Sequence, residues 1–319
     1  MDTTRVALNR ILCPVDFSEF SEHALRHAAA LARWYGAELC VMHVFPVPPP
    51  IDIIPPLATT RAPASLTPAD RNHIDEQLQR MAERVAPGMS VETVVQDAPS
   101  VYREILFRAE QWPADLVVMG THGYSGFERL VIGSVTEKIL RLSPCPVFVV
   151  PNAVVEAPVP GDVHFDRILA AVDFSESSLA ALRYAMSIAE EADARLTVLN
   201  AIEVPPELQR PPTSADYSVA AVRAQAEAER LRCLSALIPE EVQTYCTVET
   251  AVVEGKASRE ILRHADANHI DLILMGVQGR GPLDLMIFGS NAHDVIRHAS
   301  CPVLIVRAGT GRSPAEGKP

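Results

Sequence analysis

Short apolar runs alternate with stretches of helical periodicity along the first half of the chain. The runs are rich in Val, Ile and Leu and are bounded by turn residues, which is typical of buried strands. Ser18 is suited to begin the first helix as its N-cap, and Gly36 suits its left-handed end. Strands are expected at residues 10–16, 39–45, 90–95, 115–120 and 146–150, and helices at residues 18–35, 68–86, 99–111 and 134–142.

The second half repeats this alternation. It predicts strands near residues 167–173, 195–201, 243–253, 271–276 and 302–306, and helices near residues 175–192, 216–237, 257–268 and 290–298. Strands that alternate with helices imply right-handed crossovers and a mainly parallel sheet covered by helices on both faces. The predicted fold class is therefore α/β, with two tandem, open, mainly parallel five-stranded sheets of Rossmann-like type.

A set of glycines recurs in the two halves at a fixed offset. In each copy the first glycine closes an apolar run ending in Met-Gly, and a serine follows the third glycine. The differences 276−120, 279−123 and 289−133 all equal 156, so the corresponding pairs are Gly120 and Gly276, Gly123 and Gly279, and Gly133 and Gly289. Such agreement indicates an internal duplication.

A second landmark precedes the glycines in each half. Val15-Asp16-Phe17-Ser18 returns as Val172-Asp173-Phe174-Ser175, at an offset of 157. Together the landmarks predict one domain at residues 1–151, a linker at 152–165, a second domain at 166–307 and a tail at 308–319. A proline-rich segment at 46–68 and a shorter counterpart at 205–212 are expected to be irregular loops.

Length, hydropathy and net charge limit the classes of molecule that the chain is expected to bind. A length of 319 residues fits two domains, and a mean hydropathy of +0.11 suits well-buried parallel sheets. The net charge of −12 argues against nucleic acid as a partner, because nucleic acid requires a basic face. No apolar run approaches the ~20 residues of a membrane span, and residues 1–10 lack the apolar region of a signal peptide.

The cysteines agree with a reducing compartment. None of the six forms a C-x-x-C pair, and most lie in apolar runs, where cysteine behaves as a small buried hydrophobe. A soluble, cytoplasmic protein without a membrane partner is expected.

The glycines point to a site for an anion. Gly120 and Gly276 close strands, and ligands of open parallel sheets bind beyond the carboxyl ends of strands. Glycine allows close approach of the backbone and positive φ. Ser134 and Ser290 then begin helices, whose free N–H groups and dipole favour phosphate without any lysine. The alternative is that the glycines only shape tight turns, but two copies with identical spacing favour binding.

Other residues at the same edge could read the rest of a ligand. Asp16 and Asp173 are expected to end the first strands, where a carboxylate could accept hydrogen bonds from a ribose or an amine, or cap the next helix. Val44 and Ala201 end the second strands, where backbone groups could read a base edge.

Histidines give no metal site. His122 lies between two loop glycines, but Gln278 takes its place in the second half, so a shared function does not need it. His23 and His27 have the i, i+4 spacing of metal ligands, yet no third ligand is evident. Surface histidines are favoured, and no metal ligand is predicted.

These residues resemble the universal stress protein family. Its ATP-binding members carry Gly-x-x-Gly, nine residues and Gly-Ser/Thr, together with an aspartate that closes the first strand. The Cys-Pro-Val sequences at 145–147 and 301–303 are similar to the start of the family's last strand. The resemblance covers essentially the whole chain except linkers and tail.

The resemblance implies a strand order of 3-2-1-4-5 in each repeat. It also implies that the pairing of last strands, by which single-domain members dimerise, would form within this chain as an intrachain pseudo-dimer. Whether two chains associate further as a homodimer stays open.

By the same resemblance, the ligand is an adenine nucleotide, with ATP as the cofactor and Mg²⁺ as its expected counter-ion. The first repeat would contact it through Asp16, Val44, Gly120, Gly123, Gly133, Ser134, Val135 and Thr136. The second repeat would use Asp173, Ala201, Gly276, Gly279, Gly289, Ser290, Asn291 and Ala292. Asn291-Ala292 replaces Val-Thr, which removes a hydroxyl, and Gly281-Pro282 alters the loop, so the first repeat is expected to be the better site.

Three functions compete. The leading hypothesis is an ATP-binding regulatory protein of the stress response, in which nucleotide occupancy is the signal, because no Walker lysine or general base is evident. The second is a slow ATPase or self-phosphorylating enzyme that uses the hydroxyls of Ser134, Ser290 or Thr136 near a γ-phosphate. The third is a scaffold that binds a non-nucleotide ligand or a protein partner of unknown identity.

Overall fold

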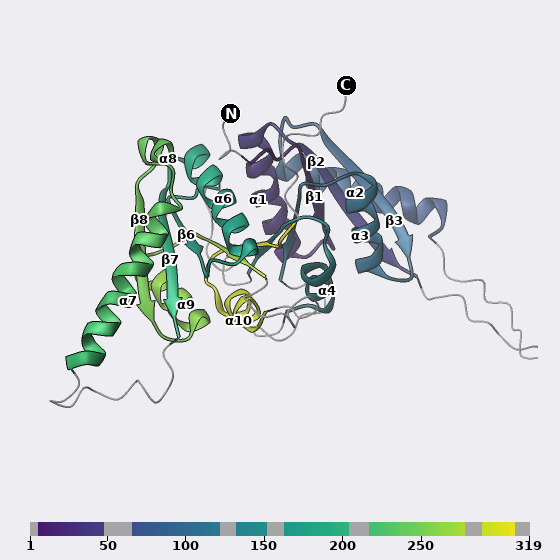
Figure 1. The fold of residues 1–319 in the computed structure, drawn as a ribbon. Coiled ribbons are helices and arrows are strands. Elements are labelled where there is room, and N and C mark those ends of the chain that lie inside the picture. Colours follow the sequence, from purple (N-terminus) through teal and green to yellow (C-terminus); the bar gives the residue numbers. More distant parts are fainter. Residues whose placement is uncertain are drawn as a thin grey trace, which may run out of the picture. The chain divides into compact units, whose positions relative to one another are not determined.

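The computed structural model describes residues 6–47, 66–121, 132–151, 163–203, 217–277 and 289–309. The described residues from 7 to 163 form one compact unit, and those from 164 onward belong to a second. Each unit is described separately below, and Figure 1 shows the course of its strands and helices.

The first unit contains a parallel sheet in the order β3-β2-β1-β4-β5. Its strands are β1 (Arg10–Pro14), β2 (Glu38–Pro46), β3 (Val91–Ala98), β4 (Leu116–Gly120) and β5 (Val147–Val150). Its helices are α1 (Glu19–Tyr35), α2 (Pro68–Val85), α3 (Val101–Gln111) and α4 (Ser134–Leu142). In the register, Leu12 of β1 lies beside Cys40 of β2 and Val117 of β4.

The second unit repeats this arrangement, with a parallel sheet in the order β8-β7-β6-β9-β10. Its strands are β6 (Arg167–Ala171), β7 (Arg195–Ile202), β8 (Val248–Glu254), β9 (Leu272–Gly276) and β10 (Val303–Val306). Its helices are α6 (Glu176–Ala192), α7 (Tyr217–Ala236), α8 (Glu240–Tyr245), α9 (Ala257–Ala267) and α10 (Ser290–His298). The predicted α/β class and the order 3-2-1-4-5 are confirmed in both units.

Helices cover both faces of each sheet (Figure 1). In the first unit α1 and α2 contact each other, as do α3 and α4, which agrees with right-handed crossovers that place these pairs on opposite faces. The central strands are therefore buried from both sides, and Ile11, Leu12 and Cys13 of β1 are fully buried. This explains why they are apolar throughout instead of alternating with polar residues.

The ends of the first helix of each unit follow the predicted chemistry. Ser18 is the N-cap of α1, and its hydroxyl accepts a hydrogen bond from the N–H of Ser21. Gly36 ends the helix in the left-handed region at φ 62°. The matching helix α6 ends at Asp193, which adopts the same conformation at φ 52°.

One predicted strand is wrong at its start. The strand expected from residue 243 begins at Val248, because Glu240–Tyr245 forms the short helix α8. Pro239 stands at the N-cap position, where its fixed φ favours helix entry, and Val242 anchors the turn by burial. The first strands are also shorter than expected, so Asp16 and Asp173 follow the strand ends by two residues.

The proline-rich segments at 46–68 and 205–212, the linker at 152–165 and the tail at 308–319 lie almost wholly outside the described residues. No helix in the part of the chain that the structure describes is long and apolar enough to cross a membrane.

Candidate functional site

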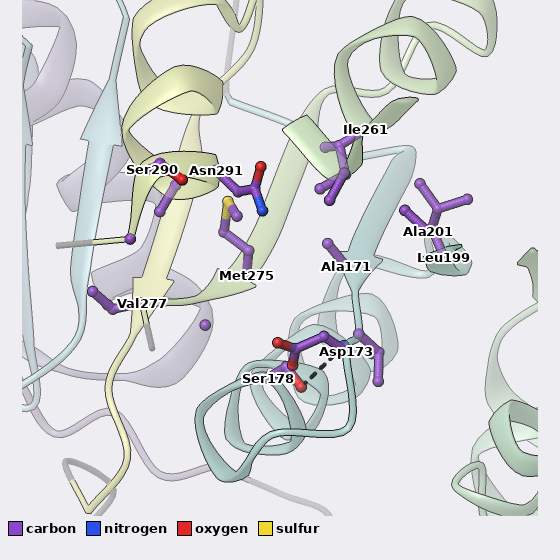
Figure 2. A pocket seen from close by; sticks show the side chains of 15 residues that line it. Ala171, Asp173, Ser178, Leu199, Ala201, Ile261, Met275, Val277, Ser290 and Asn291 are labelled. Carbon is purple, nitrogen blue, oxygen red and sulfur yellow. Dashed lines mark hydrogen bonds between the residues drawn. The ribbon is translucent and has the colours of Figure 1, made fainter. Parts of the chain in front are cut away.

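A cavity of about 240 Å³ opens at the carboxyl edge of the second unit's sheet (Figure 2). Neighbouring strands β6 and β9 are followed by helices on opposite faces, which makes this edge a topological switch point, where ligands of open α/β sheets bind. The cavity lies between the ends of β6, β7 and β9 and the beginnings of α6, α9 and α10.

The cavity brings together seven of the eight residues predicted for the second repeat. These are Asp173, Ala201, Gly276, Gly289, Ser290, Asn291 and Ala292. The eighth, Gly279, lies outside the described residues, as do Gln278, Gly281 and Pro282. Most of the remaining wall is apolar and comes from Ala171, Val172, Leu199, Ala257, Ile261, Met275 and Val277.

Asp173 is held by a tight turn before α6. Its Oδ1 accepts hydrogen bonds from the N–H of Ser175 (2.9 Å) and from the Oγ of the same residue (2.5 Å). Its own N–H donates to the Oγ of Ser178 at 3.3 Å, as Figure 2 shows. Between them Phe174 adopts φ 65°, which is rare for a bulky residue. The turn therefore both caps the helix and fixes the direction of an exposed carboxylate.

The first unit has the same turn. Asp16 Oδ1 accepts from the N–H (3.1 Å) and Oγ (2.5 Å) of Ser18, and the Asp16 N–H donates to Ser21 Oγ at 3.3 Å. Phe17 adopts φ 64°. The bonds and conformation match those of the second unit, so the duplication preserves this turn down to individual hydrogen bonds.

A polar side chain from the second strand holds each turn at its base. In the second unit the Nδ2 of Asn200 donates to the carbonyl oxygen of Val172 at 2.7 Å. In the first unit Nδ1–H of His43 donates to the carbonyl oxygen of Val15 at 2.8 Å. The centroid of the His43 ring lies 4.6 Å from that of the Phe17 ring. Burial lowers the pKa of His43, an effect that the Val15 carbonyl and the Asp16 carboxylate oppose.

Close packing explains why glycine occupies positions 276 and 289 at the cavity. A Cβ on Gly276 would lie 2.5 Å from Ser177 Oγ and 2.6 Å from the backbone nitrogen of Ser178. A Cβ on Gly289 would lie 2.7 Å from the carbonyl oxygen of Val277. Gly133 and Gly289 have φ of −59° and −55°, a conformation that is open to any residue. Glycine is required at positions 276 and 289 because backbone segments meet there.

The first turn of α10 faces the cavity with open donors. Its N-cap, Gly289, has no side chain to cap the helix, and the next three residues, Ser290, Asn291 and Ala292, all line the cavity. The first N–H groups of a helix have no partner within the helix, and its dipole is positive at this end. The arrangement favours an anion without a basic side chain.

The corresponding residues of the first unit occupy equivalent places in its fold. Gly120 ends β4, Val44 is buried near the end of β2, and Ser134 and Val135 begin α4 after Gly133. Buried Thr136 donates its hydroxyl hydrogen to the carbonyl of Gly120 at 3.0 Å, so this proton ties the helix to the strand. Gly123 and His122 lie outside the described residues.

Sequence reasoning missed Ser178 as a residue of the site. It lines the cavity and binds the Asp173 N–H. The signal was present, because Ser21 and Ser178 share the offset of 157 that relates the two aspartates. Ile261 and Leu199 were also missed, since an apolar residue in a helix or strand gives no sign of which cavity it faces.

One of the paired histidines belongs to the core of the first unit. His27 is buried, and its Nδ1–H donates to the backbone carbonyl of His23 at 2.9 Å. Burial lowers the pKa of His27 to about 4. His27 is therefore a core residue and not the surface histidine that was expected, and no cluster of three or more ligating side chains occurs among the described residues.

Comparison with known proteins identifies the family to which both units belong. The model of the Universal stress protein family matches the chain twice, at residues 7–151 and 164–307. The chain therefore belongs to the universal stress protein family.

Individual relatives agree with the duplication. Universal stress protein MJ0531 of Methanocaldococcus jannaschii is 32% identical over 44% of this chain and 81% of its own length. A universal stress protein of Mycolicibacterium smegmatis is 28% identical over 93% of this chain and 96% of its own. The crystal structure of protein PA1789 of Pseudomonas aeruginosa, described as functionally unknown, has a TM-score of 0.65 at 19% identity and covers 95% of this chain and 93% of its own, which shows a shared fold.

Proposed function

We propose that the chain binds an adenine nucleotide at the carboxyl edge of each sheet and that ATP is the physiological ligand. Occupancy of the sites would then be the signal of a stress-response regulatory protein. The observation that carries the proposal is the second unit's cavity, which gathers the residues predicted for a nucleotide from four separate segments of the chain.

The chemistry of the cavity suits the parts of a nucleotide. The open N–H groups and hydroxyl at the start of α10 suit phosphate oxygens. The carboxylate of Asp173, pinned by Ser175, suits a ribose hydroxyl. The apolar wall that includes Leu199, Ala201 and Ile261 suits a base.

Calorimetric titration of the nucleotide-stripped full chain with ATP, with and without Mg²⁺, tests the proposal. We expect saturable binding with two sites per chain. Asp173→Ala should weaken one of them by about tenfold, because it removes a charged hydrogen-bond acceptor. Asp166→Ala, which removes an exposed carboxylate from the opposite end of β6, is the matched control and should leave both unchanged. Absence of any heat of binding would reject the proposal.

Hydrolysis is a second candidate, favoured by one observation. The hydroxyl-bearing Ser290 lies at the cavity wall beside the helix N-terminus, where a terminal phosphate could reach it. Release of labelled phosphate from ATP, compared with buffer and with Ser290→Ala, measures this activity. A rate equal to that in buffer would exclude it.

A further inference from the structure

The wall of the second cavity differs from the first unit at one side chain that reaches inward. Asn291 stands where the first unit has Val135, since 291−135 gives the repeat offset of 156. Figure 2 shows its amide reaching from α10 into the pocket, with Ser290 and Met275 to one side and Ile261 and Ala171 to the other. A pair of methyl groups is thus replaced by a polar group in the middle of the site.

The orientation of this amide follows from its one partner. Asn291 Oδ1 accepts a hydrogen bond from the backbone N–H of Ser258, the second residue of α9, at 3.3 Å. A backbone N–H can only donate, so the oxygen must face it, and the NH₂ group turns away from α9. Among the described residues this NH₂ has no hydrogen-bond partner, so two N–H donors are available to a ligand.

Neighbouring substitutions hold the amide in this position. Asp294 accepts hydrogen bonds from Lys256 Nζ at 2.7 Å and from Ser258 Oγ at 3.1 Å, which ties α10 to the first turn of α9. The first unit joins the same two helices differently, through Lys138, whose Nζ lies 4.5 Å from the ring centre of Tyr102. Ser258 and Asp294 replace Tyr102 and Lys138 at the same offset of 156. The second unit therefore has both the polar Asn291 and the polar hydrogen bonds of Asp294, where the first unit has neither.

The position of the Asn291 amide in the cavity indicates which part of a bound ligand would lie beside it. The helix N-terminus at Ser290 is one end of the cavity, and the apolar wall at Leu199 and Ala201 is another. Asn291 lies between them, where a nucleotide bound as proposed above has its sugar and first phosphate. Asp173 already supplies an acceptor for sugar hydroxyls, whereas phosphate oxygens need donors.

We propose that Asn291 is a specificity-determining residue that donates a hydrogen bond to the phosphate nearest the sugar in the second unit. The inference rests on the proposed nucleotide site. It assigns the two units different preferences: the second gains affinity from the first phosphate through a donor that Val135 cannot supply in the first. The change at Asn291 therefore alters selectivity and does not simply weaken the site.

Asn291→Asp tests this with little change of shape. A carboxylate can still accept from the Ser258 N–H, but it offers no donor and places a negative charge beside the phosphate. An acidic residue in the first turn also favours the helix, so α10 should remain folded. Asn291→Val copies the first unit, and Asn72→Asp adds the same charge at an exposed position of α2 as a matched control.

Amide hydrogen exchange on the full chain reads the two units separately, through peptides covering α4 and α10. With AMP as the probe, we expect Asn291→Asp to weaken protection of α10 by at least about tenfold in concentration, which is the usual effect of losing a hydrogen bond to a charged group. Asn291→Val should give a smaller loss. Adenosine should protect α10 equally in all variants, and α4 should be unaffected throughout.

Three results would overturn the inference. If Asn291→Asp bound AMP like the unsubstituted chain, the amide would serve only to accept from Ser258. If the substitutions weakened the protection of α10 by adenosine as much as the protection by AMP, Asn291 would contact the sugar or the base. If AMP protected α4 but never α10, the second cavity would not bind nucleotide, while protection of neither helix by AMP or ATP would reject the nucleotide site itself.

Discussion

The turn after the first strand and the helix pair around the phosphate end have diverged to different extents between the two units. At Asp16 and Asp173 the hydrogen bonds that each aspartate makes with the two serines that follow it, and the rare φ of the phenylalanine, are the same. Around α4 and α10 the contacts with α3 and α9 use different side-chain chemistry. The first region is constrained by backbone geometry, which few sequences satisfy, whereas the second is built from side-chain contacts that can change together. Three further experiments separate, at other positions of the two units, backbone constraints from changes of side-chain chemistry.

The largest effect is expected at the crowded glycine of the second unit. Gly276→Ala places a Cβ within 2.7 Å of two backbone atoms of Ser177 and Ser178, which cannot move without shifting α6. Overpacking of this kind lowers the free energy of unfolding by about 3 kcal/mol. Calorimetric unfolding measures it, with Gly88→Ala as the reference for backbone strain without overpacking, because Gly88 has φ 74° and a Cβ there meets nothing within 4 Å. Equal losses for the two variants would contradict the packing argument.

A pH-dependent difference is expected from the buried position that is His27 in the first unit and Tyr184 in the second. Because the pKa of His27 falls to about 4 in the folded chain, the unfolded chain takes up a proton first as pH falls below ~6.5. Stability from the neutral histidine is thus present above pH ~6.5 and is lost towards pH 4, by about 2 kcal/mol at pH 5.

His27→Tyr should remove this loss. Urea unfolding of both chains at pH 7.5 and pH 5 gives the difference, and other titrating groups cancel because the two chains share them. An identical pH dependence would show that the pKa of His27 is the same in the folded and the unfolded chain.

The smallest effect concerns the ends of α1 and α6. Gly36 and Asp193 occupy the same left-handed position, where only glycine lacks a steric cost. Asp193→Gly should raise the free energy of unfolding by about 0.5 kcal/mol, and Gly36→Asp should lower it by about 1 kcal/mol. Thermal unfolding followed by circular dichroism measures both. A loss of stability on Asp193→Gly would mean that the aspartate side chain contributes more than its backbone costs.

Local signals in the sequence predicted most of the fold. The caps Ser18 and Gly36 act within a few residues of their own helix, and apolar runs buried from both faces are distinct enough to be read as strands. Helix α8 was missed because its six residues carry no full amphipathic period.

The candidate site was predictable only as far as the repeat extends. The residues of the duplicated landmarks lie around one cavity. The two glycines there, however, are required by contacts with distant residues: Gly276 packs against Ser177, and Gly289 packs against Val277 at the other end of the loop. The change to Asn291-Ala292 was interpreted only as the loss of a hydroxyl, with no role for the new amide. Its orientation depends on a backbone N–H 33 residues away, which no local pattern encodes.

The strand order also determines how long a newly made strand remains unpaired during synthesis. In the first unit, β1 lies at the centre of the sheet between β2 and β4. The strand β4 is synthesised much later than β1, because Ile11 pairs with Leu116. At ribosomal rates of ~5–20 residues per second, the apolar edge of β1 waits about 5–20 seconds for that partner. An unpaired edge of this kind invites association with other chains. The nascent chain therefore passes through an interval in which a chaperone has a defined segment, Ile11 to Cys13, to protect.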